Sequence, residues 1–302
     1  MFHPDAIGRH PATSVLHYAE AMPERFYQAY VFDMDGTVYL GDQMLPGAVR
    51  LITELRRRDI PVRFLSNNPT RDPAQYAAKL TRLGLPTPAS DIVNTIVVMT
   101  KWLQANHPGA RVYPIAEQPL IDALTAAGIA ITEDPAQIDI VIASYDRTFT
   151  YAKLQTAFDA IWYHQRAILV TTNPDRYCPF PGGRGEPDAA AIVAAIEACT
   201  GTTLTKNVGK PDPAMLTAAL EGLDVDPAEC VMVGDRLHTD IAMAAAAGIP
   251  SALVLTGDST AAEARAADAA HRPTFVLDRV DHLLPAGVRA ELGWVDEPSP
   301  TA

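Results

Sequence analysis

Short apolar runs alternate with longer amphipathic segments along most of the chain. Strands are expected at 30–32, 62–65, 230–233 and 251–255, and helices at 51–58, 73–83, 241–247 and 261–269. Pro73 fits the first turn of its helix, where a missing N–H is tolerated. Strands that alternate with helices are typical of a parallel sheet with helical crossovers.

The middle of the chain repeats the same alternation. Strands are expected at 111–115, 138–143 and 167–171, and helices at 119–127 and 151–164. This block supplies no second set of aspartates at strand ends, so we interpret it as an inserted domain. The prediction is an α/β fold: a Rossmann-like parallel-sheet core formed by residues 1–104 and 189–302, with an α/β domain inserted at 105–188. Residues 1–27 carry no interpretable motif.

The apolar strands of the core end in polar residues or glycine. Open parallel sheets bind ligands at the carboxyl ends of their strands, so these endings are expected to meet in one crevice. The strongest ending is Asp33-Met34-Asp35-Gly36-Thr37, in which the two carboxylates are two residues apart and can face the same side. Gly36 permits a tight turn and a close backbone approach to phosphate.

Two carboxylates this close need a cation if both are to remain ionised. Mg²⁺ suits the position, because it binds one or two carboxylates together with water and substrate phosphate. An aspartate can act as a nucleophile that forms an aspartyl-phosphate, and a second carboxyl can serve as general acid and base. Asp33 and Asp35 are the candidates. The alternative is a turn with two solvated aspartates.

Three further endings support the catalytic interpretation. Ser66, Asn67 and Asn68 offer a hydroxyl, amides and N–H groups for phosphoryl oxygens, although such runs also form ordinary turns. Lys210 lies between Gly209 and Pro211, where its charge would offset phosphate and carboxylates; a solvated surface lysine is the alternative. The segment after the strand expected at 230–233 supplies two more acids. Asp235 is a candidate metal ligand, and Asp240 is either a metal-site residue or a helix cap.

The order of these four motifs resembles the haloacid dehalogenase superfamily from about residue 28 onward. The resemblance implies Asp33 as nucleophile, Asp35 as general acid and base, and Ser66 and Lys210 as phosphate-binding residues. It also implies Mg²⁺ held by Asp33, the Asp35 backbone carbonyl and Asp235, with support from Asp240. Family members that cleave carbon–halogen bonds lack the second aspartate, so Asp35 favours phosphate chemistry.

The position of the insertion resembles the C2-type cap of the para-nitrophenyl phosphatase and pyridoxal phosphatase branch. In that branch, the segment after Thr172-Asn173-Pro174-Asp175 overhangs the site, which makes Cys178, Arg184 and Asp188 candidate substrate contacts. Pyridoxal and phosphoglycolate phosphatases usually have histidine at the position of Cys178. The alternatives are a packing role for Cys178, a solvated Arg184 and a helix-terminal Asp188.

Composition restricts the partners. The formal net charge of −12 disfavours nucleic acid, and three cysteines without a C-x-x-C pair fit a reducing cytosol. No signal peptide is recognisable, and no apolar run approaches the roughly 20 residues of a membrane-spanning helix, so a cytoplasmic protein without membrane contact is expected.

Caps of this type often dimerise in the family. Apolar positions in 151–164 are therefore a candidate homodimer surface, with packing inside the cap as the alternative.

The expected function is Mg²⁺-dependent hydrolysis of a small phosphorylated metabolite, with a sugar or polyol phosphate favoured. Pyridoxal phosphate, phosphoglycolate and nucleotides remain alternative substrates. Phosphotransferase or mutase activity, or a non-catalytic binding module, are the other interpretations. The chain has neither a Gly-x-Gly-x-x-Gly motif nor a P-loop, so a nucleotide cofactor is not expected.

Overall fold

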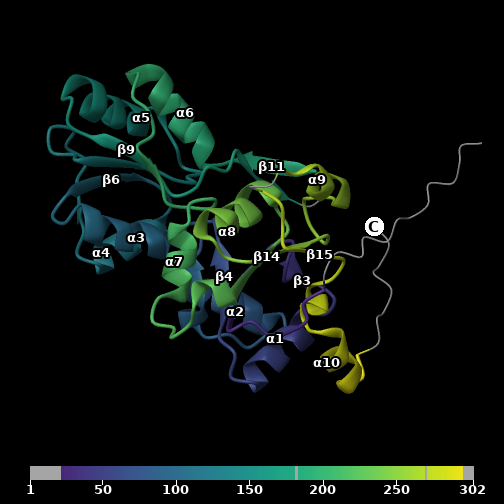
Figure 1. Ribbon diagram of the computed structural model, residues 1–302. Helices are drawn as coiled ribbons and strands as arrows, with labels where there is room; N and C mark the ends of the chain where they lie inside the picture. The colour runs from purple at the N-terminus through teal and green to yellow at the C-terminus, as the bar shows by residue number, and fades with distance from the viewer. Residues whose placement is uncertain (1–21, 181–182, 269–270, 295–302) are drawn as a thin grey trace, which may run out of the picture.

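The computed structural model describes residues 22–180, 183–268 and 271–294. Two parallel sheets with helices on their faces form a larger core and a smaller unit, which lies at the upper left of Figure 1. The α/β class and the Rossmann-like core expected from the sequence are confirmed. The expectations for residues 1–21 lie outside the described residues.

The core sheet has six parallel strands in the described residues. Their order is β15 (Phe275–Leu277), β14 (Ser251–Val254), β13 (Cys230–Gly234), β1 (Ala29–Asp33), β4 (Val62–Ser66) and β5 (Ile92–Asn94). The central strand β1 is buried along its whole length, because helices cover both faces. Tyr30 and Phe32 contact one side of the hydrophobic core, and Ala29 and Val31 contact the other.

Helices on each face come from segments far apart in sequence. One face carries α1 (Ala48–Arg57) and α2 (Pro73–Arg82), and the other carries α7 (Ala214–Leu220) and α8 (Ala242–Ala247). The remaining elements of the core are β2 (Tyr39–Leu40), β3 (Gln43–Met44), η1 (Ala89–Asp91), η3 (Pro227–Glu229), η4 (Leu237–Ile241), α9 (Ala261–Ala266), η5 (Val280–Leu283) and α10 (Ala286–Glu291). The α2 helix starts at a capping box in which Asp72 and Gln75 satisfy each other's backbone N–H, and Pro73 follows the cap as expected.

The second sheet has five parallel strands in the described residues. Their order is β12 (Lys206–Asn207), β9 (Ile168–Thr171), β8 (Ile140–Ala143), β6 (Arg111–Ile115) and β7 (Ala130–Ile131). Its faces are covered by α3 (Thr95–Asn106) and α4 (Gln118–Ala126) on one side, and by α5 (Tyr151–Phe158), η2 (Asp159–Tyr163) and α6 (Ala189–Thr200) on the other. A hairpin of β10 (Tyr177–Phe180) and β11 (Arg184–Pro187) leaves this unit toward the core.

Two elements that follow the boundary expected at residue 188, α6 and β12, contact the inserted sheet. Ile192 and Ile196 of α6 pack in the same hydrophobic cluster as β8 and β9, and β12 pairs with β9. Residues 189–207 therefore lie with the inserted sheet rather than with the core. We propose that the insertion runs from about the end of α3 to residue 207, and we refer to it as the cap.

Several aromatic side chains on the cap remain exposed. Tyr151, Trp162 and Tyr163 are among the exposed large side chains, and Phe158 stacks on Trp162. They lie in the segment where the sequence suggested a homodimer contact. That contact stays a prediction.

Candidate active site

A cavity of about 370 Å³ lies at the carboxyl edge of the core sheet, beneath the cap hairpin. Its wall brings together residues that follow β1, β4, β13 and β14, together with Lys210 and the base of the hairpin. The lining residues expected from the sequence are Asp33, Asp35, Gly36, Ser66, Asn67, Asn68, Cys178, Asp188, Lys210 and Asp235. The strand endings therefore converge in one crevice, as the parallel arrangement predicted.

The loop after β1 brings Asp33 and Gly36 against the loop after β13. The Met34 carbonyl accepts hydrogen bonds from Val38 N (2.8 Å) and Tyr39 N (3.1 Å), which closes a tight turn. Gly36 has a φ of 88°, and a Cβ atom at this residue would lie 2.5 Å from Asp235 Oδ2. Glycine is required here by both its backbone angle and the nearby carboxylate.

Lys210 is buried between two acids. Its Nζ donates to Asp33 Oδ1 and, at 2.7 Å, to Asp240 Oδ1. Burial alone would lower the pKa of Lys210, but the Asp240 and Asp33 carboxylates outweigh it and raise that pKa. Lys210 is therefore a fixed cation directly beside the candidate nucleophile, and not a solvated surface lysine.

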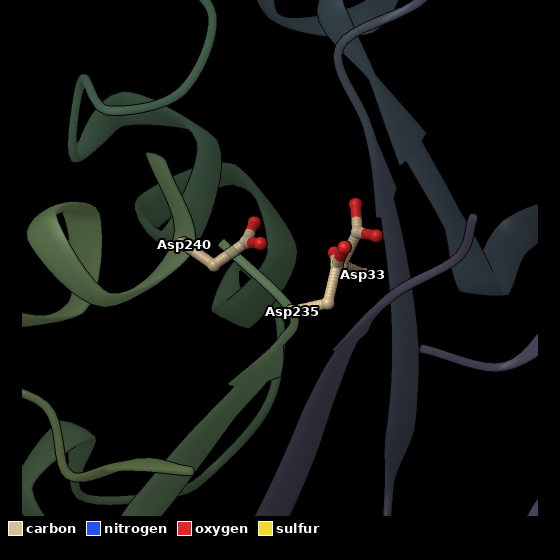
Figure 2. A group of neighbouring side chains, drawn as sticks. All are labelled: Asp33, Asp235 and Asp240. Carbon is tan, nitrogen blue, oxygen red and sulfur yellow. The ribbon is translucent and has the colours of Figure 1, made fainter. Parts of the chain in front are cut away.

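Three buried carboxylates surround this position. One oxygen each of Asp33, Asp235 and Asp240 lies within 4.8 Å of the others. In Figure 2 the Asp240 side chain, from the segment that follows Asp235, points toward Asp235 and toward Asp33 at the end of β1. Burial raises the pKa of Asp33 against the opposing effect of Lys210, and burial with nearby Asp240 raises the pKa of Asp235 to about 6. Three carboxylates facing one ammonium leave an excess of buried negative charge.

The donor set fits a hard divalent cation. Asp235 Oδ2 accepts from Asp258 N at 2.8 Å, whereas Asp235 Oδ1 is buried and has no hydrogen-bond partner among the described residues. A buried carboxylate oxygen without a donor is costly unless a cation approaches it. Asp240 supports the cluster through Lys210 and also accepts from Arg236 N at 3.1 Å. The Asp35 carboxylate is not part of the cluster, and the expected ligation through its backbone carbonyl stays a prediction.

Comparison with known proteins identifies the chain. The family model of haloacid dehalogenase-like hydrolases matches residues 30–130, and the HAD-hydrolase-like model matches residues 207–283. An acid sugar phosphatase of Staphylococcus saprophyticus is 34% identical over 238 residues, covering 78% of this chain and 90% of that protein. The chain belongs to the haloacid dehalogenase-like hydrolase family.

Solved structures of similar sequence share the fold of this hydrolase. A 4-nitrophenylphosphatase of Thermotoga maritima superposes with a TM-score of 0.79 at 32% identity, over 85% of this chain and 96% of that one. A glycerol phosphate phosphatase of Mycobacterium tuberculosis, solved in complex with magnesium, gives a TM-score of 0.78 at 32% identity, over 85% of this chain and 77% of that one. The family, branch and enzyme class expected from the motifs are confirmed.

The loop after β4, residues 66–70, is the one expected to bind phosphate, and we refer to it as the phosphate loop. Its shape is fixed by hydrogen bonds of its own side chains. Ser66 Oγ donates to Tyr76 OH at 3.1 Å and accepts from Asn68 N at 3.2 Å. Asn68 Oδ1 accepts from the backbone N and the hydroxyl of Thr70, which shapes the turn before α2. Asn67 Oδ1 accepts from Lys210 N at 2.7 Å, so this hydrogen bond fixes the position of the loop relative to the Lys210 backbone.

The cap contributes the outer wall of the cavity. Cys178 Sγ lies 3.8 Å from Asn68 Nδ2, and burial raises the pKa of the thiol, so it is a wall contact and not a nucleophile. Asp188 Oδ1 accepts from Ala189 N at 2.6 Å, so this residue is the N-cap of α6 and also lines the cavity. Burial raises the pKa of Asp188 to about 6.

Arg184 does not fit the expectation of a substrate contact. It is exposed on β11, where its backbone pairs with Phe180, and it is not among the described residues that line the cavity. The alternative interpretation of Arg184, a solvated loop arginine, agrees better with this position.

Other lining residues were not predicted from the sequence. They include Arg71, Asp175, Tyr177, Arg236 and Asp258. A usable signal existed for Arg236, which directly follows Asp235 at a strand end, and for Asp258, which lies shortly after the strand expected at 251–255.

Among the described helices, none is both long and apolar enough to cross a membrane.

Proposed function

We propose that this family member is a Mg²⁺-dependent phosphatase that hydrolyses small phosphate monoesters through an aspartyl-phosphate on Asp33. The observation that supports the proposal most is the contact of Lys210 with Asp33. It lies beside the Asp235 oxygen that has no hydrogen-bond partner in the described part of the chain. This arrangement provides a carboxylate nucleophile, a fixed positive charge and a cation site within one cavity.

The first step is in-line attack of the Asp33 carboxylate on phosphorus. The bond to the ester oxygen breaks on the opposite side, and Asp35 supplies the proton that this oxygen takes up. Lys210 and the Ser66 loop neutralise and orient the equatorial phosphoryl oxygens. Asp35 suits its role because it lines the cavity only two residues beyond Asp33. Partial shielding from solvent in the cavity raises the pKa of Asp35, and Lys79 opposes the rise.

The second step returns the enzyme to its starting state. Water gives a proton to Asp35 and attacks phosphorus, which releases inorganic phosphate and the free Asp33 carboxylate. Asp33, Asp235 and the Asp35 backbone carbonyl would hold Mg²⁺, with Asp240 in support. When bound, the ion supplies positive charge for the phosphoryl oxygens and offsets the excess of buried carboxylates.

A sugar or polyol phosphate is the substrate we favour. Asp175 and Asp188 bring carboxylate oxygens to the wall beyond the phosphate loop, and carboxylates can accept hydrogen bonds from the hydroxyl groups of a leaving group. The similar Staphylococcus protein is named a sugar phosphatase. Phosphate release from matched panels of sugar, polyol, nucleotide and vitamin phosphates tests this assignment; a preference for pyridoxal phosphate or nucleotides would contradict it.

Metal removal should abolish turnover reversibly. Treatment with EDTA followed by gel filtration is expected to stop phosphate release from para-nitrophenyl phosphate, and added Mg²⁺ should restore it. Because the ion offsets three buried carboxylates, Mg²⁺ should also raise the thermal unfolding midpoint of the metal-free protein without any substrate. Full activity of metal-free protein would refute the proposal.

Crowding Asp235 should weaken the metal site specifically. At Gly257, an added Cβ would lie 2.0 Å from Asp235 Oδ2, so Gly257→Ala must displace this carboxylate. We expect the Mg²⁺ concentration for half-maximal activity to rise roughly 10- to 100-fold. Gly287→Ala is the control, because nothing lies within 4 Å of its added Cβ. Equal Mg²⁺ dependence of the two variants would contradict the assignment of Asp235.

A further inference from the structure

The base of the cap hairpin is joined to the phosphate loop by Asp175. Asp175 Oδ2 accepts from Asn67 Nδ2 at 3.1 Å and from Asn173 Nδ2 at 3.0 Å. Asn173 is buried, and its Nδ2 also donates to Asp188 Oδ1 at 3.0 Å. One amide therefore bridges the two stems of the hairpin, and one carboxylate connects that bridge to the core.

Asn67 carries this connection to Lys210. Its Oδ1 accepts from Lys210 N at 2.7 Å, and its Nδ2 donates to Lys210 O at 3.3 Å as well as to Asp175. Both backbone polar groups of Lys210 are thus bonded to one side chain. Asp175 and the two backbone groups of Lys210 together fix which way that amide faces, because an amide turned by half a rotation would present oxygen to the Asp175 carboxylate.

The three loops approach one another closely at Gly209. A Cβ atom at Gly209 would lie 2.4 Å from Thr172 O, 2.9 Å from Asn67 Oδ1 and 3.0 Å from Asn173 Cα. The residue next to Lys210 is therefore pressed against both the phosphate loop and the hairpin base. A shift of the hairpin base must reach Lys210, whose Nζ contacts Asp33.

We infer that Asp175 is a positioning residue for the phosphoryl-transfer step, acting through Asn67 on Lys210. This inference rests on the proposed function and adds a residue to it. Because its effect is on alignment, its loss should reduce kcat more than it changes KM. One oxygen of an amide can still accept from both Asn67 and Asn173, so the conservative change at this position should preserve the alignment.

The test compares Asp175→Ala and Asp175→Asn with wild type in steady-state turnover of para-nitrophenyl phosphate. We expect the kcat of the alanine variant to fall roughly 10- to 100-fold with little change in KM. The asparagine variant should keep most of the wild-type kcat. Asp134→Ala is the control, because it removes an exposed carboxylate whose hydrogen bonds are local to the segment between β7 and β8. Should Asp175→Ala not fold, Asp175→Ser, too short to reach Asn67, takes its place.

A double-mutant cycle with Asn67→Ala then tests the route. If Asp175 acts through Asn67, Asp175→Ala should cost almost nothing further in the Asn67→Ala background. An equal cost in both backgrounds, a fully active Asp175→Ala, or an Asp175→Asn as slow as the alanine variant would each overturn the inference. Failure of the proposed function would look different, since wild type itself would then release no phosphate.

Discussion

Asp33→Asn is expected to reduce phosphate release from any monoester by at least about 10⁴-fold, because the amide cannot form an aspartyl-phosphate. The substitution is nearly isosteric, and an amide oxygen can still accept from Lys210 Nζ. The loss should therefore appear in kcat of a folded protein. Steady-state release of nitrophenolate and of inorganic phosphate measures it, with Asp122→Asn on the exposed surface of α4 as the control.

The same variant makes a second, independent prediction about stability. Asp33→Asn removes one of three crowded carboxylates, two of which pair with Lys210, so the metal-free variant should unfold at a temperature no lower than wild type. Its stabilisation by Mg²⁺ should be smaller, because one ligand is lost. A variant that keeps wild-type turnover would eliminate Asp33 as nucleophile, whereas a strongly destabilised variant would contradict the crowded-carboxylate description.

The core of the site could be predicted from sequence because its chemistry lies at strand ends. An apolar run such as 30–32 identifies a buried strand, and in a parallel sheet the first polar residues after it must reach the shared edge. Asp33 and Asp235 follow such runs directly, and the structure places both in one carboxylate cluster. Lys210 follows a strand of only two residues, β12, and was found through its Gly-Lys-Pro motif instead.

Elements without a clear period were missed or misassigned. Helix α3 contains Ile96, Val98 and Met99 in its buried set and packs between core and cap, so it lacks a polar face that would mark it. The strands β5 and β15 are only three residues long. The sequence alone does not show that α6 contacts the cap sheet, because the small side chains of an alanine-rich helix do not indicate which of two sheets they contact.

Side-chain contacts between distant loops also lay beyond sequence reasoning. Asp175 is 108 positions from Asn67. The string 172–175 marks the start of the overhanging segment, but it does not indicate which side chain Asp175 contacts. Arg184, in contrast, was expected at the site because it lies in the overhanging segment. Alternating residues of a hairpin face opposite sides, and pairing of β10 with β11 leaves Arg184 exposed.

Asp35→Asn should separate the two chemical steps. Nitrophenolate is a stable leaving group that needs little proton donation, so attack by Asp33 should continue, whereas activation of water by residue 35 is lost. We expect a rapid burst of about one nitrophenolate per enzyme, followed by turnover reduced by about 10²- to 10⁴-fold. Rapid-mixing absorbance measures the burst, and acid quenching followed by intact mass analysis detects the phosphorylated protein.

An alkyl ester such as glycerol phosphate should behave differently in the same variant. Its alkoxide leaves poorly without a proton, so both steps should slow and no phosphorylated protein should accumulate. Asp42 is an exposed acid in the same region of the core, and it is not one of the described residues that line the cavity. The Asp42→Asn variant should therefore behave as wild type with both esters. If Asp35→Asn showed equal losses and no burst with either ester, residue 35 would act in substrate or metal binding and not in proton transfer. The contrast between the two leaving groups therefore tests the role of Asp35 without relying on the size of the rate loss alone.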